Sequence, residues 1–104
     1  MEKSLVIAGL AALAQETRLD IVRYLVRHGA ERVPAGRIGA AFGLPSATLS
    51  FHLNALVAAG LVTRQRAGRQ TLYGADIAAV HGLTAYLLEN CCTESGAQSK
   101  TDAA

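Results

Sequence analysis

Two adjacent cysteines, Cys91 and Cys92, are the only cysteines in the chain of 104 residues. Neighbouring thiols in a cytosolic protein indicate soft-ion binding or redox chemistry rather than a structural disulfide. Adjacent side chains on a regular helix point about 100° apart, so we expect this pair at a fraying helix end, where both thiolates can reach one ion. Thiolates select soft ions, and trivalent arsenic and antimony fit. In the alternative interpretation, Cys91 packs as a small core residue and Cys92 is its neighbour by chance, without a function.

Basic residues are concentrated in one segment. No acidic residue lies between Glu31 and Asp76, and the interval contains five arginines: Arg32, Arg37, Arg64, Arg66 and Arg69. The rest of the chain carries five basic and eight acidic residues. A chain with its positive charge in one segment suits a DNA-facing surface, because phosphate contacts supply most of the affinity. A solvated basic face is the alternative.

The elements that must position these residues follow from the hydrophobic pattern. A composition that is 51% hydrophobic but only 5% aromatic favours a helical core in a single domain. Apolar periodicity predicts helices over residues 3–14, 18–27, 35–42, 44–60 and 76–91. Alternation over residues 61–66 and 70–73, around a turn at 67–69, predicts a β-hairpin, and residues 31–35 are expected to form a loop. The fold class is therefore mainly α with a small β part (α+β).

This order of elements is that of a winged helix-turn-helix, with five helices and a two-stranded β-hairpin wing before the last helix. Gly43 permits the tight turn between the third and fourth helices. The exposed face of the fourth helix is expected to carry Ser46, Ala47, Thr48, Ser50, Phe51, His52 and Asn54. Small polar side chains there can enter a major groove. The expected DNA contacts are Ser46, Thr48, Ser50, His52, Arg64, Arg66 and Arg69.

Four segments resemble the ArsR/SmtB-type (arsenic-repressor) family of dimeric metal and metalloid sensors. Residues 13–21 (LAQETRLDI) are similar to its LA-x-x-TR-x-x-I second helix, and residues 45–53 (PSATLSFHL) to its S-x-S-T-V-S-H-H-L recognition helix. Residues 59–62 (AGLV) and 68–73 (GRQTLY) match its helix exit and wing. The resemblance covers residues 5–92 and departs at Pro45 and Phe51, where the family tends to have Ser and His.

The resemblance implies a sensing site, which varies within the family. The founding arsenic site, a cysteine pair in an E-L-C-V-C-D-L segment of the third helix, is absent, because residues 31–38 contain no cysteine. A second family site uses carboxylate and histidine ligands paired across the last helices of the dimer. It needs a second histidine with a downstream acid, which this chain lacks. His28, His52 and His81 are far apart in sequence, so we expect no zinc site, and His81 is expected to pack or lie at a dimer surface. Cys91 and Cys92 remain as the metalloid ligands.

We therefore expect a transcriptional repressor that binds double-stranded operator DNA as a homodimer, with no obligatory cofactor. Its inducer is expected to be trivalent arsenic or antimony. Inorganic arsenite uses three thiolates for a saturated site, whereas an organoarsenical such as methylarsenite needs two. Two thiols per subunit favour the organoarsenical, or arsenite with its third position filled by water, glutathione or the partner subunit.

Three alternatives use the same features differently. A redox-responsive repressor would be switched by oxidation of the same thiols. A thiol oxidoreductase or arsenate reductase would need an anion loop, a C-x-x-C spacing or a nearby general base, and these are absent, so we expect no enzyme. A winged helix that binds only proteins would not need an acid-free wing bearing arginines.

The dimer interface is expected on the last helix and the first. The apolar stripe of the last helix includes Cys91, and the interface residues are expected to be Leu5, Leu10, Ile77, Val80, Leu83 and Leu87. No apolar run reaches the roughly 18 residues of a membrane span, so we expect a cytoplasmic protein with no membrane partner. The folded domain is expected over residues 1–92, with a disordered tail at 93–104.

Overall fold

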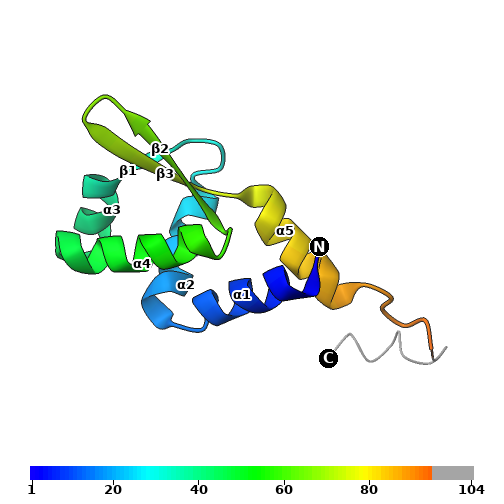
Figure 1. Cartoon of the computed structure of the whole chain (residues 1–104). Coiled ribbons are helices and arrows are strands. Elements are labelled where there is room, and N and C mark those ends of the chain that lie inside the picture. The colour runs from blue at the N-terminus through cyan, green and yellow to red at the C-terminus, as the bar shows by residue number, and fades with distance from the viewer. Residues whose placement is uncertain (95–104) are drawn as a thin grey trace.

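Five helices and three short strands are present in the computed structural model, which describes residues 1–94 (Figure 1). In chain order they are α1 (Lys3–Leu13), α2 (Glu16–Arg27), β1 (Val33–Pro34), α3 (Ala35–Phe42), α4 (Ser46–Ala58), β2 (Val62–Ala67), β3 (Gln70–Ala75) and α5 (Ile77–Leu88). The expected winged helix-turn-helix with a mainly α fold is confirmed. Apart from Thr93 and Glu94, the tail expected to be disordered lies outside the described residues.

Local sequence signals fix the ends of several helices. The Gln15 side chain accepts a hydrogen bond from the backbone N–H of Arg18 and caps α2, and Asp76 caps α5 through the N–H of Ala79. Gly43 ends α3 with φ of 63°, in the left-handed region that favours glycine. The tight turn expected between α3 and α4 is therefore present.

The wing belongs to a three-stranded antiparallel sheet with the order β1-β3-β2. Val33 and Pro34 of β1 pair with Tyr73 and Leu72 of β3, so the loop expected at 31–35 is wrong at these two positions. Two residues are too few to show the alternation that marks a strand. The strand forms because Val33 is fully buried and its backbone pairs with β3.

The core lies where α2, α4 and the sheet meet, and its largest fully buried side chains are Ile21, Leu25, Val33, Ile38, Leu53, Leu56 and Leu61. Not every apolar residue of α2 faces this core. Leu19 and Val26 are exposed, while Ile21 is fully buried. The helix turns the face of Ile21, Val22 and Leu25 inward, and the two flanking apolar residues border an open depression beside α5.

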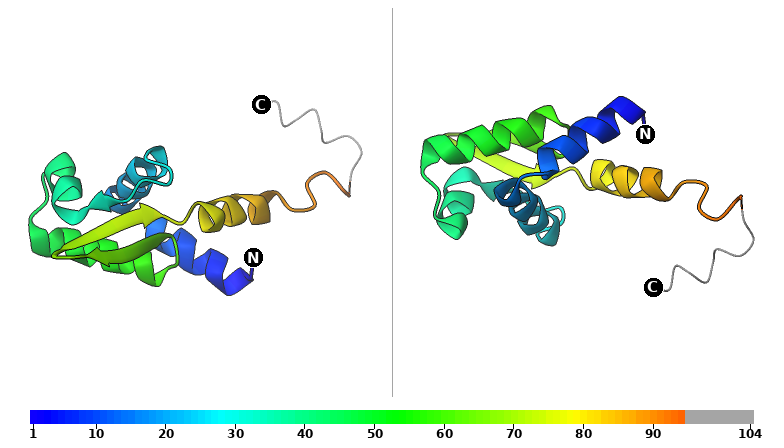
Figure 2. Two further views of the ribbon diagram at one scale, coloured as in Figure 1. Left: turned by 90° about the horizontal axis from the view of Figure 1, so that it is seen from above. Right: turned by 90° about the horizontal axis from the view of Figure 1, so that it is seen from below.

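Helices α1 and α5 pack side by side at the end of the molecule away from the wing (Figure 2). Gly9 makes this close approach possible, because a Cβ atom there would lie 2.9 Å from Cδ1 of Leu83. Among the described residues, no helix has the length and apolar character required to cross a membrane.

Candidate nucleic-acid interface and cysteine pair

The start of α4 presents three small hydroxyl side chains to solvent. Ser46, Thr48 and Ser50 are all exposed, as expected. Ser46 and Ser50 are four residues apart and share one side of the helix. Pro45 precedes the helix without a side-chain cap, so amide groups of the first turn remain available to an anion. This end of α4 can therefore approach a base edge or a phosphate.

His52 does not share that exposed face, contrary to expectation. Its side chain is 8% exposed, and its Nδ1 accepts a hydrogen bond from Nε of Arg18 at 3.2 Å. Burial, and secondarily the Arg18 charge, lower the pKa of His52. The helix turns His52 inward beside Leu49, Leu53 and Leu56, so it supports α4 from behind.

Phe51 faces outward, as expected, and is 64% exposed. The guanidinium of Arg18 lies 5.3 Å from the centre of the Phe51 ring, within the range of a cation–π contact. Arg18 thus contacts two consecutive residues of α4 from α2. We did not single it out from the sequence, because Arg18 and His52 are 34 positions apart and no local pattern predicts their contact.

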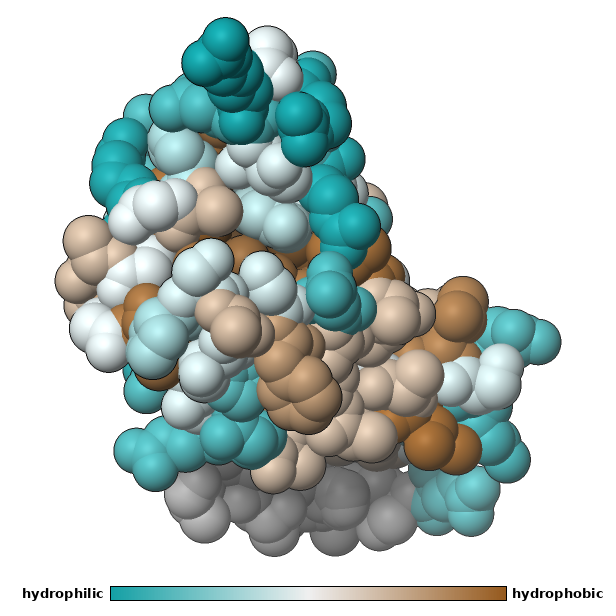
Figure 3. Space-filling model, turned by 60° about the vertical axis from the view of Figure 1, so that its left-hand side comes forward, coloured by the Kyte–Doolittle hydropathy of each residue, from teal (hydrophilic) through white to brown (hydrophobic). Residues whose placement is uncertain are grey.

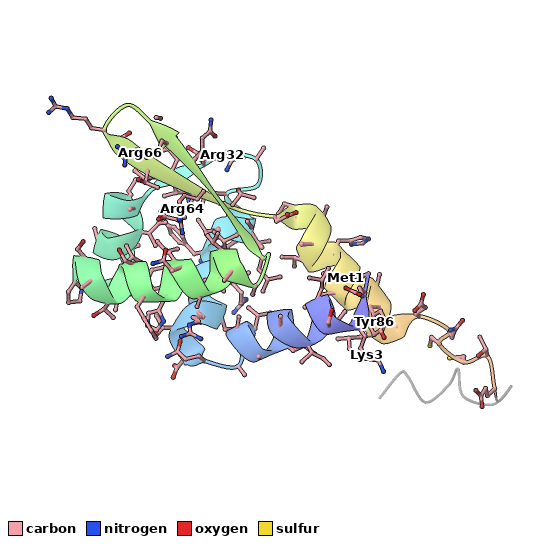
Figure 4. The ribbon with its side chains drawn as sticks, viewed as in Figure 1. Met1, Lys3, Arg32, Arg64, Arg66 and Tyr86 are labelled. Atoms are coloured by element: carbon pink, nitrogen blue, oxygen red, sulfur yellow. The ribbon has the colours of Figure 1, made fainter. Side chains whose placement is uncertain are left out.

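Arg64 joins the wing to α4. Its Nη2 donates a hydrogen bond to Oδ1 of Asn54 at 2.7 Å, and its guanidinium lies 5.9 Å from the centre of the Tyr73 ring. Figure 4 shows Arg64 between the hairpin and α4. This exposed arginine therefore fixes the wing relative to the helix as well as adding charge to the surface.

Arg66 and Arg69 lie at the tip of the wing and are both exposed. Arg66 donates to the carbonyl of Gly68 at a long 3.4 Å, and Arg69 donates to no other described side chain or carbonyl. Hydrophilic residues gather at this upper end of the molecule in Figure 3, and apolar residues gather lower down. The expected wing arginines are therefore placed where a nucleic acid could reach them.

Cys91 and Cys92 lie beyond α5, which ends at Leu88. The expectation that Cys91 continues the helical stripe is wrong, because the backbone leaves the helix at Glu89 and turns through left-handed conformations at Asn90 and Cys92. Both cysteines are exposed, and their sulfur atoms are 2.9 Å apart. The hydrogen bond between the two thiols raises the pKa of Cys92, because it stabilises the protonated form of that thiol.

The chain matches the family of helix-turn-helix domains over residues 13–65. It is 31% identical to an ArsR-like transcriptional regulator from Rhodococcus sp. RHA1, with 88% of this chain and 82% of that one covered and a TM-score of 0.72. The chain belongs to the ArsR/SmtB-type winged-helix regulators. It is thus a DNA-binding transcriptional regulator of this family, with α4 as its recognition helix.

Two further solved structures are similar to this chain. A homodimeric winged helix-turn-helix DNA-binding domain from Mycobacterium bovis is 28% identical, with 84% of this chain and 81% of that one covered and a TM-score of 0.66. A possible transcriptional regulator for arsenical resistance is 25% identical, with 92% of this chain and 95% of that one covered and a TM-score of 0.67. No curated protein matches the sequence.

Much of the exposed apolar surface of this ArsR-type regulator lies on α1 and α5. Of the residues expected at a dimer interface, four are exposed: Leu5, Leu10, Ile77 and Leu87. Val80 is half-buried, and Leu83 is only 7% exposed because it packs over Gly9 within the same chain. Leu83 is therefore a core residue rather than an open interface residue. Ile7 and Leu88 are also exposed, and the predicted interface did not include them.

Proposed function

We propose that this regulator binds operator DNA as a homodimer and represses transcription until trivalent arsenic or antimony binds to Cys91 and Cys92. One observation carries the proposal: two exposed thiols whose sulfur atoms lie 2.9 Å apart at the end of α5. The similarity to a possible regulator for arsenical resistance supports the choice of ligand. The open α4 face and the wing arginines support operator binding.

The donor set fits a ligand that uses two thiols. Among residues 1–94, no group of three or more His, Cys, Asp or Glu side chains could hold a metal ion. A trivalent organoarsenical with one arsenic–carbon bond needs two sulfur ligands. When two thiols bind methylarsenite, two arsenic–oxygen bonds break, two arsenic–sulfur bonds form, and each hydroxyl leaves as water with a thiol proton. The arsenic stays trivalent, and no electrons are transferred.

Dimerisation through α1 and α5 would cover the exposed apolar side chains of both helices. Leu5, Leu10 and Leu87 are large apolar residues left open to solvent in the single chain. Large contiguous apolar patches on a soluble chain typically mark an interface. The homodimeric state described for the Mycobacterium bovis domain supports this assembly.

The position of the cysteines suggests how release would occur. They follow α5 directly, and α5 packs on α1, so a ligand that reorders residues 89–92 would act next to the proposed interface. A change in dimer geometry would move the two recognition helices relative to each other. Coupling of about 1–3 kcal/mol between ligand and DNA gives roughly 5- to 150-fold weaker binding.

Oxidation of the same thiols is the second candidate, because their contact would also allow a disulfide between neighbours. Two thiols and one peroxide would give a disulfide and two water molecules, with the sulfurs oxidised and the peroxide reduced. The raised pKa of Cys92 lowers its thiolate fraction, whereas redox-sensing cysteines have a low pKa. Metalloid binding also uses thiolate sulfur, so it is the similarity to a possible regulator for arsenical resistance, and not this pKa, that favours the metalloid.

The experiment measures release from a fluorescent duplex carrying the promoter of the regulator's own gene. Methylarsenite, arsenite, antimonite, zinc, cadmium and peroxide are titrated into the complex in separate series. We expect methylarsenite to act at lower concentration than arsenite, and zinc to have no effect. Cys91→Ser and Cys92→Ser should bind DNA normally and resist release, while Thr93→Ala, beside the pair, should respond like the wild type.

Two outcomes would change the conclusion. If the double Cys→Ser protein still released DNA with trivalent arsenic, metalloid sensing at this site would be wrong, because the chain has no other cysteine. If only peroxide released the wild type, and the double variant lost that response, the redox candidate would replace it.

A further inference from the structure

A pocket of about 540 Å³ lies between the start of α3 and the turn of the wing. Residues 34–37 form one wall, and residues 69–71 form the other. The short strand β1 holds these walls together, because Pro34 pairs with Leu72 immediately before α3 begins. We call it the α3–wing pocket.

Two arginines line this pocket, one from each wall. Arg37 comes from α3 and Arg69 from the wing, and both are exposed. Arg32, Arg64 and Arg66 each donate a hydrogen bond within the chain, whereas Arg37 and Arg69 donate none to another described residue. They are therefore the uncommitted arginines of the acid-free segment.

The chemistry of the walls suits an anion. No acidic residue lies between Glu31 and Asp76 to neutralise the two arginines from within the segment. Two like charges that line one pocket repel each other, and an anion between them removes that repulsion. A phosphate oxygen pair is a good partner, because guanidinium groups bind phosphate through paired N–H donors. Thr71 and Gln70 add uncharged donors.

The pocket continues toward the recognition helix. A second depression of about 320 Å³ shares Ala35 and Gly36 with it and reaches Ser46 and Ser50 of α4. The two together make a path from the wing, past the start of α3, to the side chains expected to read bases. A DNA strand whose bases face α4 can therefore place its backbone along this path.

We propose that the α3–wing pocket binds one phosphodiester group of the operator backbone between Arg37 and Arg69. The inference rests on the proposed operator binding and adds Arg37, on the first helix of the helix-turn-helix, as a contact residue. One phosphate shared by two arginines also fixes the distance between the wing and α3 on the DNA.

The test is the salt dependence of duplex binding for Arg37→Gln, Arg69→Gln and the double variant. Each phosphate contact contributes about 0.9 to the slope of log K against log salt. In a homodimer each contact occurs twice, so if both arginines of one subunit hold the same phosphate, each single variant should lower the slope by up to about 1.8. The double variant should lower it by about 1.8 rather than twice that. Arg27→Gln, on α2 outside the pocket, is the control and should bind like the wild type.

Neutral methylphosphonate groups, placed one at a time in the duplex, locate the contact. One position should weaken wild-type binding and have no further effect on Arg37→Gln. Circular dichroism verifies that the variants fold, and Arg37→Lys should retain more of the slope than Arg37→Gln.

Three outcomes separate the possible failures. If the wild type does not bind duplex DNA, the proposed function fails with this inference. If it binds, but Arg37→Gln keeps the wild-type slope and affinity, only the pocket assignment is wrong. If inorganic phosphate binds the free protein tightly and Arg37→Gln abolishes that binding without changing DNA affinity, the pocket takes a small free anion and the backbone assignment is overturned.

Discussion

Arg18 on α2 donates a hydrogen bond from Nε to Nδ1 of His52 on α4, across 3.2 Å. The bond requires an unprotonated Nδ1, so the ring is neutral and its proton lies on Nε2. Arg18 also packs on Phe51, so one side chain holds two consecutive residues of the recognition helix. The orientation of α4 thus depends on a partner outside the helix-turn-helix.

This contact makes stability depend on pH. The folded state lowers the pKa of His52 from 6.5, through burial and the Arg18 charge, so folding favours the neutral ring. The stabilisation is fully present above pH 6.5 and is lost as the pH falls through the lowered value. Urea unfolding between pH 5 and pH 8 should show this loss, and His52→Gln should flatten it. His81→Gln, at an exposed position, should retain it; an unchanged profile in His52→Gln would contradict the assignment.

The α1–α5 surface should control assembly. Leu87 is 59% exposed in the single chain, and Leu87→Glu would place an unpaired charge in the proposed interface. We expect monomers in sedimentation and loss of operator binding, without loss of the fold. Leu83→Ala is the matched comparison: it should cost about 2–5 kcal/mol of unfolding free energy as a core substitution. A Leu87→Glu dimer that still binds DNA would place the interface on another face.

Base reading should depend on the exposed hydroxyls of α4. Thr48→Ala together with Ser50→Ala should reduce discrimination between operator and unrelated duplex, because these side chains can bond to base edges. Competition binding at fixed salt measures that ratio. Intact discrimination would mean that the regulator reads DNA shape instead.

The wing arginines should separate into two roles. Arg66→Ala should weaken binding to all sequences and lower the salt slope by about 1.8, as expected for one phosphate contact from each subunit of the dimer. Asn54→Ala, which frees Arg64 from its 2.7 Å partner, should leave the slope unchanged and alter operator preference by loosening the wing. The measurement is a salt series on two duplexes. Equal slopes for Arg66→Ala and the wild type would show that Arg66 is merely solvated.

The sequence predicted the elements that repeat a clear local pattern. Helix α3 was expected at residues 35–42, where it lies, because Gly43 has no side chain and can take the left-handed turn that ends it. His52 shows how a correct pattern can be misread. Leu49, His52, Leu53 and Leu56 are spaced as one buried face, but the polar ring of His52 indicated exposure. Its partner, Arg18, is visible only in three dimensions.

Other features could not be predicted because they depend on contacts between distant segments. Leu83 is buried because Gly9, on another helix, leaves room for it. The sulfur contact of Cys91 and Cys92 depends on left-handed backbone at Asn90 and Cys92, which non-glycine residues rarely adopt. Arg37 and Arg69 come together because β1 pairs with β3, and a two-residue strand leaves no pattern to detect.

The order of the sheet has a consequence for solubility. A strand at a sheet edge offers free N–H and C=O groups on which another chain can form a further strand, and such pairing leads to aggregation. Here one edge is β1, which has only two residues, and Pro34 has no N–H to donate. The other edge is β2, which carries the positive charges of Arg64 and Arg66. The arginines assigned to DNA therefore also protect the edge, and replacing both with apolar residues should promote self-association through the sheet.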